Sequence, residues 1–92
     1  MSASISSDIL ASYAADAARD VEGVRGLSRN RGVRIEQENG RVRVELHLAV
    51  GWGTSIPELG VEVQRRVAAY LARMASIEPE SVDVVVDEIV TS

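Results

Sequence analysis

Val33-Arg-Ile-Glu-Gln-Glu-Asn39-Gly40-Arg-Val-Arg-Val-Glu-Leu-His-Leu-Ala-Val50 is the stretch of this sequence that decides the fold. Apolar and polar residues alternate on both sides of Asn39-Gly40. This dipeptide is favoured in type I′ turns, because both central positions of such a turn need a positive φ. The stretch therefore predicts a β-hairpin over residues 33–50 that turns at residues 39 and 40.

The proposed turn also sets which residues of the two strands lie opposite one another. One face would carry the charged pairs Glu38 with Arg41, Glu36 with Arg43, and Arg34 with Glu45. The other face would carry Gln37 with Val42, Ile35 with Val44, and Val33 with Leu46. A shift by one residue would bury the charges and expose the aliphatic side chains, so turn chemistry and charge pairing favour the same register. The hairpin then has one apolar face that the rest of the chain must cover.

Composition limits both the core and the classes of function. The 92 residues suit one domain, and with no Phe, one Trp and two Tyr the core must be aliphatic. The absence of Cys excludes disulfides and thiolate chemistry. A net charge of −4 argues against non-specific nucleic-acid binding and docking on anionic lipid. Without a signal peptide or an apolar span of about 18 residues, we expect a cytoplasmic protein with no direct membrane insertion.

Two segments have the periodicity of amphipathic helices. Residues 5–21 carry apolar side chains at a spacing of four, with capping candidates at Ser6, Ser7 and Asp8 and a terminating glycine at Gly23. A second helix begins at Ser55, which forms a capping box with Glu58, and it ends near residue 76.

The remaining segments complete an α-β-β-α-β order. Residues 23–32 contain three glycines and three arginines and are expected to form an exposed loop. Residues 81–90 predict a third strand with Val82, Val84 and Val86 facing inward, and Val85 and Ile89 on the opposite face. The predicted class is α+β: a three-stranded mixed sheet with two helices packed on one face, and the last strand parallel to the second.

A search for catalytic chemistry finds little. His47 is the only histidine, and by alternation it lies on the charged face near Glu45. A metal site with Glu45 and Asp83, or a pH-sensing role, are alternatives to the favoured interpretation of a solvated strand residue. We therefore expect no catalytic residue, no metal site and no cofactor. Asp83, Asp87 and Glu88 are interpreted as charges that protect a sheet edge.

An arginine-rich loop gives the alternative function. Gly23-Val24-Arg25-Gly26 has the form of the GXXG loop with which KH domains clamp a nucleic-acid backbone. Arg25, Arg29, Arg31 and Arg34 are the nucleic-acid-binding candidates. However, that clamp joins two helices, whereas here the tetrapeptide leads from a helix toward a strand. A solvated loop is the favoured interpretation.

Trp52 lies between two glycines in the loop that precedes the second helix. It either packs over the end of the sheet or presents a contact for another protein, since Trp is enriched among binding hot spots. Trp52, Gly53 and Thr54 are therefore the candidate partner-binding residues, with the exposed sheet edge as a second candidate surface.

Several segments together resemble one family. They are Val21-Glu-Gly-Val-Arg-Gly-Leu27, the hairpin strand that runs into Trp52-Gly53, Ile56-Pro57, and Val63-Gln-Arg-Arg-Val67. The chain resembles the alkaline shock protein family of bacterial envelope-stress proteins from about residue 5 to residue 90. It departs from that family at Trp52, where a tyrosine is usual, and at Asp87-Glu88, where a glycine-containing turn is common.

The resemblance implies a non-enzymatic cytoplasmic protein that lies near the membrane. Such a protein is recruited by a membrane-anchored protein partner and supports the cell envelope under stress. The resemblance also implies self-association into a homo-oligomer, and it implies no small-molecule substrate and no catalytic motif.

Overall fold

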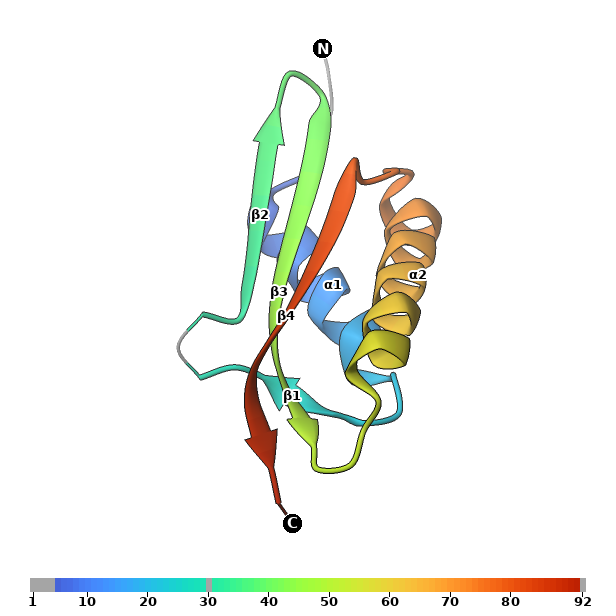
Figure 1. Cartoon of the computed structure of the whole chain (residues 1–92). Helices are drawn as coiled ribbons and strands as arrows, with labels where there is room; N and C mark the ends of the chain where they lie inside the picture. Colours follow the sequence, from blue (N-terminus) through green and yellow to red (C-terminus); the bar gives the residue numbers. More distant parts are fainter. Residues whose placement is uncertain (1–4, 30, 92) are drawn as a thin grey trace.

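The computed structural model describes residues 5–29 and 31–91. Its two helices and four strands form an α+β domain, which confirms the predicted class (Figure 1). The elements in chain order are α1 (Ser7–Arg19), β1 (Val24–Leu27), β2 (Val33–Glu38), β3 (Arg41–Gly51), α2 (Ile56–Ala75) and β4 (Ser81–Val90).

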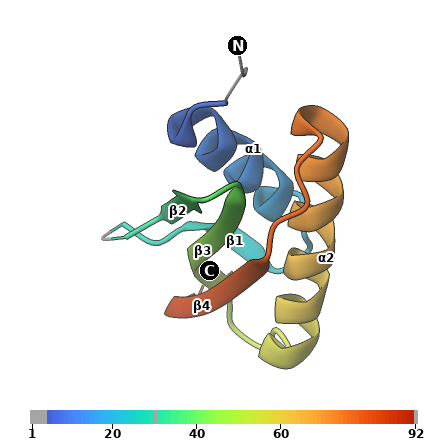
Figure 2. The ribbon, with the colours of Figure 1, turned by 90° about the horizontal axis from the view of Figure 1, so that it is seen from above.

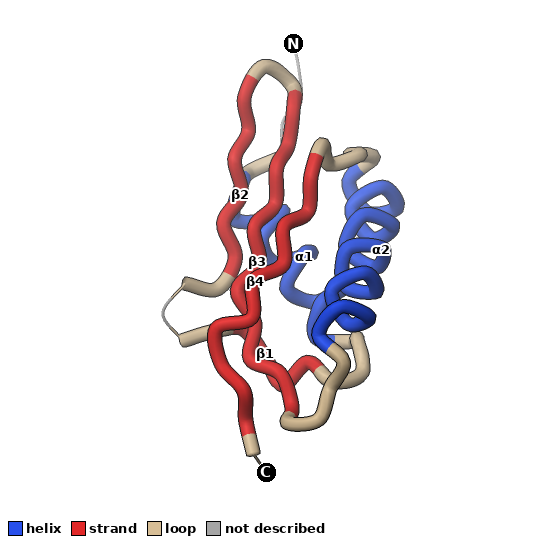
Figure 3. The backbone as a smooth tube through the Cα atoms, in the orientation of Figure 1, coloured by secondary structure: helices blue, strands red, loops and turns tan. Residues whose placement is uncertain are grey.

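The sheet is built around β3, its longest strand. Along one edge β3 pairs with β4 in parallel, as expected for a strand that returns after a helix. Along the other edge it pairs antiparallel first with β2 and then with β1 (Figure 3). The sheet is therefore mixed, and β1 and β2 lie one after the other along the same edge of β3.

The strand β1 corrects the expectation that residues 23–32 form only a loop. Its backbone is fixed by hydrogen bonds at both ends: Gly51 N–H donates to Gly23 O (2.9 Å) and Ser28 N–H donates to His47 O (2.7 Å). Val24 and Leu27 pack against the core. The reason is the length of β3. Its last residue paired with β2 is Leu46, and it continues for five more residues, whose backbone groups need hydrogen-bond partners along that edge.

The hairpin has the predicted turn and register. Asn39 and Gly40 have φ values of 52° and 78°. The Cα partners run from Glu38 opposite Arg41 to Val33 opposite Leu46. Gln37, the one polar residue on the apolar face, donates its side-chain amide to Ser7 Oγ at the start of α1 (3.0 Å).

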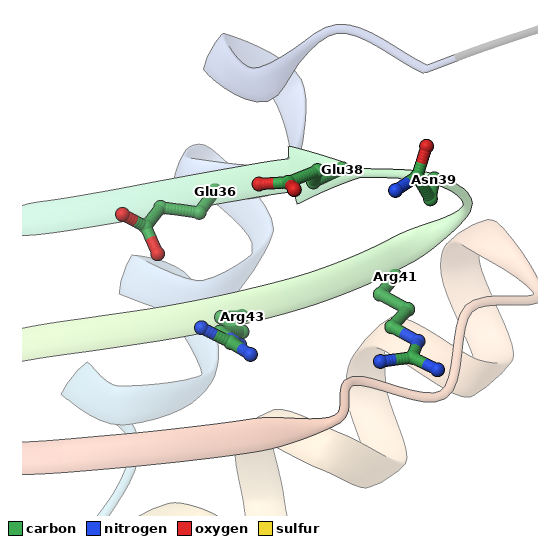
Figure 4. Close-up of a pocket in the computed structure, with 5 residues that line it drawn as sticks. All are labelled: Glu36, Glu38, Asn39, Arg41 and Arg43. Carbon is green, nitrogen blue, oxygen red and sulfur yellow. The ribbon is translucent and has the colours of Figure 1, made fainter.

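The expected ion pairs across the hairpin are wrong, although its register is right. Arg41 and Arg43 both turn away from β2 and contact Glu80, just before β4, at 3.7 and 3.3 Å. Figure 4 shows Arg41 extending from β3 toward the segment before β4 and Arg43 lying over β3, with neither side chain directed at the glutamates of β2. Long arginine stems reach the next strand easily, so exposed charges do not specify the partner by themselves.

Both helices cover the same face of the sheet (Figure 2). The core between them is aliphatic, and its largest fully buried side chains are Leu10, Leu46, Leu48, Leu71, Val44, Val50, Val63 and Val67. Ala14 and Ala18 of α1 are fully buried, because alanine lets the helix lie close to its neighbours. Because both helices lie on one side, neither covers the other face of the sheet, which we call the open face.

The helix ends differ in part from the expectations. The helix α2 starts and ends as predicted, with Ser55 and Ser76 as its caps. However, Ser55 makes no side-chain capping bond, so the expected capping box with Glu58 is wrong. The helix α1 ends at Arg19, before Gly23.

The strand β4 spans the predicted residues, but a bulge changes its later part. Val82, Val84 and Val86 pack against the core as expected. Between the pairs Leu48 with Val86 and Ala49 with Glu88, Asp87 is an extra residue. Ile89 consequently pairs with the core residue Val50 and does not lie on the face of Val85, which corrects the alternation expected from the sequence.

Candidate functional site

The tryptophan loop, residues 52–54, follows β3 and leads into α2. Trp52 N–H donates to Val90 O (3.0 Å), and Thr54 N–H donates to Gly51 O (3.2 Å). Gly53 takes a φ of 86°, which favours glycine. The backbone is thus held in place while the Trp52 side chain is 76% exposed. Of the two alternatives for Trp52, the structure has the exposed side chain and not the one packed over the sheet.

A groove of about 580 Å³ lies beside this loop. It is bounded by the segment after α1, the tryptophan loop and the first turns of α2, which gather at one end of the molecule (Figure 1). Its lining residues are Val21, Glu22, Gly23, Trp52, Gly53, Thr54, Ser55, Glu58, Leu59, Glu62 and Arg66. We call it the Trp52 groove.

The charged side chains of the Trp52 groove are unevenly paired. The Glu62 carboxylate accepts hydrogen bonds from Arg65 (2.6 Å) and Arg66 (2.8 Å), and these bonds, the Arg65 contact first, lower the pKa of Glu62. Glu22 and Glu58 are exposed and make no ion pair or side-chain hydrogen bond within the described residues. Neither acid was among the site residues expected from the sequence, since nothing local to 22 or 58 shows that the two share a groove.

A second cluster lies on the open face of the sheet, around His47. Its Nε2 lies 2.7 Å from Glu45 Oε2 and its Nδ1 lies 2.9 Å from Asp87 Oδ2. His47 is only 5% exposed, which corrects the expectation of a solvated side chain. The contact with Asp87 joins residues 40 positions apart at the bulge of β4, so no sequence pattern could have revealed it.

The cluster favours a protonated imidazole. Hydrogen bonding to Glu45 is the largest cause that raises the pKa of His47, and Asp87 adds to it, while burial opposes both. A neutral imidazole has only one N–H to donate, so both contacts are donated bonds only in the charged form. The same contact with His47 lowers the pKa of Glu45.

The cluster differs from the metal-site alternative. Glu45 and Asp87 contact opposite nitrogens of the ring, so their oxygens do not converge on one point with a single nitrogen. Asp83 is the β-sheet partner of Glu45, and among the described residues it forms no ion pair or hydrogen bond with His47. Within residues 5–29 and 31–91, no group of three His, Asp or Glu side chains is placed to hold a metal ion.

The arginine candidates are spread over several elements. The GXXG tetrapeptide begins just before β1 and continues into it, where Val24 and Gly26 pair with β3. Arg25 lies over Gly51, with Nε 3.0 Å from where a Cβ on that glycine would be. The backbone N–H of Arg29 donates to the Glu88 carboxylate (3.1 Å), and Arg34 contacts Glu36. Arg31 is exposed. The tetrapeptide therefore does not form a loop between two helices.

The fold and its exposed tryptophan loop define a small α+β domain of two helices on one face of a mixed four-stranded sheet. The chain belongs to the alkaline shock protein 23 family, described by a cell envelope-related function, whose model matches residues 1–91. That description names no enzymatic activity. The family agrees with the resemblance seen in the sequence.

One similar curated protein is the uncharacterized protein YloU of Bacillus subtilis (strain 168). It is 27% identical over 99 aligned residues, which cover 89% of this chain and 82% of YloU.

Solved structures of the MamM CTD share the fold. A manganese form of one variant has a TM-score of 0.61 at 20% identity, covering 88% of this chain and 96% of that chain. A cadmium form has a TM-score of 0.62 at 20% identity, covering 88% and 94%. Another variant reaches 0.64 at 18% identity, covering 90% and 98%. At such identities the likeness concerns the fold alone. Neither helix in the described part of the chain is long and apolar enough to span a membrane.

Proposed function

We propose that this protein is a non-enzymatic interaction module that supports the cell envelope under stress. It acts in the cytoplasm, associates with further copies of itself, and binds a membrane-anchored protein partner through Trp52, Gly53 and Thr54. The cell envelope-related function of its family supports this role.

The single observation that carries the proposal is the exposure of Trp52 on a fixed backbone. A tryptophan side chain buries up to about 250 Å² when a partner covers it, which makes it a strong anchor. Because hydrogen bonds to Val90 and Gly51 already hold the loop, binding orders little additional backbone. An exposed side chain of this size on a small aliphatic domain has no role in its own core.

Self-association has independent support from nearby apolar surface. Ile56 at the start of α2 is 42% exposed and Val90 at the end of β4 is 37% exposed, and Val90 is hydrogen-bonded to Trp52. Covering such surface in an assembly would add burial to a domain whose core lacks phenylalanine.

Metal binding is not part of the proposal, although the related structures include manganese and cadmium forms. The described residues contain no three-residue cluster that suits a metal ion. RNA binding through Arg25, Arg29, Arg31 and Arg34 is less well supported, because the tetrapeptide that suggested it contributes to β1.

The test compares the full chain with its Trp52→Ala variant. Each is immobilised and exposed to a detergent-solubilised membrane lysate, and the captured proteins are identified. Self-association is measured separately by sedimentation. Trp52→Ala is expected to lose capture of a membrane protein and to weaken assembly. The control is Met74→Ala, which removes an apolar side chain that is 45% exposed in the last turns of α2.

Met74→Ala is expected to keep both properties. Circular dichroism checks that both variants are folded. A folded Trp52→Ala variant that retains full capture and full assembly would remove the tryptophan loop as the contact surface.

A further inference from the structure

We propose that the Trp52 groove receives an arginine or lysine side chain from a basic segment of the protein partner. This inference rests on the proposed function and names the chemistry of the partner, which neither the family description nor the related proteins specify.

The groove is large enough to receive a long side chain. Its volume of about 580 Å³ exceeds that of one amino-acid side chain, and Trp52 is among the residues that line it. Gly23 lies at the groove, and a Cβ added there would be 2.8 Å from Thr54 Cγ2, so the segment after α1 packs directly against the tryptophan loop. Both walls of the groove are therefore fixed by contacts within the fold.

The charge of the groove selects a cation. Three carboxylates, those of Glu22, Glu58 and Glu62, line it against the single guanidinium of Arg66. Arg66 is already hydrogen-bonded to Glu62, and the carboxylates of Glu22 and Glu58 have no ion-pair partner among the described residues. Glu58 lies in the first turn of α2, so only the positive end of the helix dipole offsets its charge. An incoming cation gains attraction from both, whereas a phosphate or an acidic peptide would be repelled.

The aromatic side chain is an independent feature that favours the same ligand. A guanidinium or ammonium group is attracted to the face of a tryptophan ring within about 6 Å, and Arg also stacks on such rings. Trp52 is 76% exposed beside the two free acids. A basic side chain fits such a surface in two ways: its charge is attracted to the unpaired carboxylates, and its apolar stem can lie against the aromatic face.

The experiment uses Trp52 as its own probe, since it is the one tryptophan in the chain. The full protein is titrated with an acetylated, amidated peptide of alternating glycine and arginine that carries three arginines. The matched peptide has glutamate in place of arginine. We expect a saturable change of tryptophan fluorescence with the arginine peptide and none with the glutamate peptide. The affinity should fall as salt rises, because the exposed carboxylates are screened.

Two double variants distinguish an effect of the groove carboxylates from an effect of the protein's net charge. The double variant Glu22→Gln with Glu58→Gln is expected to weaken binding of the arginine peptide at least about fivefold, which is the scale of losing exposed charge contacts. Glu36→Gln with Glu38→Gln changes net charge equally, on β2 at the hairpin end of the molecule, and should change the affinity by less than about twofold. Circular dichroism checks folding of both double variants.

Three results would overturn the inference: no binding of the arginine peptide, equal weakening by the two double variants, or equal binding of both peptides. Loss of self-association in the Glu22→Gln, Glu58→Gln variant would also overturn it, since a second copy would then fill the groove.

The outcome is separable from that of the proposed function. If Trp52→Ala abolishes capture of the membrane partner while the Glu22→Gln, Glu58→Gln variant retains it, the proposed function stands and the basic-segment inference falls. If Trp52→Ala retains capture, the proposed function itself falls.

Discussion

Gly23 is the residue at which the fold and the candidate site meet. Its φ is 99°, a conformation that residues with a side chain rarely adopt. A Cβ there would lie 2.8 Å from Thr54 Cγ2 and 3.1 Å from Leu59 Cδ1. Its carbonyl also accepts the hydrogen bond from Gly51 N–H that fixes the end of β3. Any side chain at this position must displace the tryptophan loop or the start of α2.

Gly23→Ala is therefore expected to lower the free energy of unfolding by about 1–3 kcal/mol, because backbone strain adds to overpacking. The matched control is Gly60→Ala inside α2, where no atom lies within 4 Å of the added Cβ apart from the adjoining residues and the backbone of α2 itself. That change should raise the free energy of unfolding by about 0.5–1 kcal/mol through helix propensity. Urea denaturation of the three proteins measures both effects. An unchanged midpoint for Gly23→Ala would contradict the close contact with Thr54.

At the scale of the elements, the two helices begin in different ways. Ser6 caps α1, and its Oγ accepts a hydrogen bond from Ile9 N–H (3.2 Å). Ser55 precedes α2 without any side-chain capping bond. The helix α2 instead has Pro57 in its first turn and a continuous buried row, Leu59, Val63, Val67 and Leu71. Packing, more than capping, keeps α2 in place.

The two serines provide a paired test of helix capping. Ser6→Ala is expected to lower the free energy of unfolding by about 1 kcal/mol, because it leaves an N–H at the start of α1 without its acceptor. Ser55→Ala should change it by only a few tenths of a kcal/mol, since no side-chain bond is lost. Thermal and urea unfolding of both variants give the comparison. A larger loss for Ser55→Ala than for Ser6→Ala would show that the hydroxyl of Ser55 caps α2 in solution.

At the scale of the whole molecule, the His47 cluster links the stability of the sheet to pH. It joins the middle of β3 to the bulge of β4, and Glu45 and Asp87 are the charged groups in contact with the ring. Arg31 and Arg34 lie on the side of Glu45 and contribute to its lowered pKa. Protonation of one side chain thus affects how the carboxyl-terminal part of β4 is held.

The pKa of His47 is raised in the folded state, so its contribution to stability is complete below pH 6.5, the ordinary value, and is lost as the pH rises through the raised value. The pKa of Glu45 is lowered in the folded state, so its contribution to stability is present above pH 4.5, the ordinary value, and is lost as the pH falls through the lowered value. We expect the urea midpoint to decline on the alkaline side of pH 6.5, and a histidine NMR titration midpoint above 6.5.

The control for this pH dependence is His47→Gln, which keeps a polar side chain but does not titrate. It should remove the decline on the alkaline side while leaving the acid side largely unchanged. A titration midpoint at or below 6.5 for this sole histidine would contradict the double carboxylate contact.

The sequence by itself determined the features that depend on neighbours along the chain. Alternation and the Asn39-Gly40 pair set the hairpin and its register, and apolar spacing set the limits of α2 and β4. These were predictable because turn conformation and periodicity are properties of a few consecutive residues.

Only the tertiary structure decided which residues from distant parts of the chain contact one another. The strand β1 forms because β3 extends past β2, the bulge at Asp87 closes the cluster around His47, and Glu22 and Glu58 meet beside Trp52. Each of these arrangements joins segments that are far apart in the chain and brought together by packing of the whole domain. Charge and alternation along one strand carry no information about such partners, because exposed ion pairs are weak and a single extra residue reverses the facing of every residue after it.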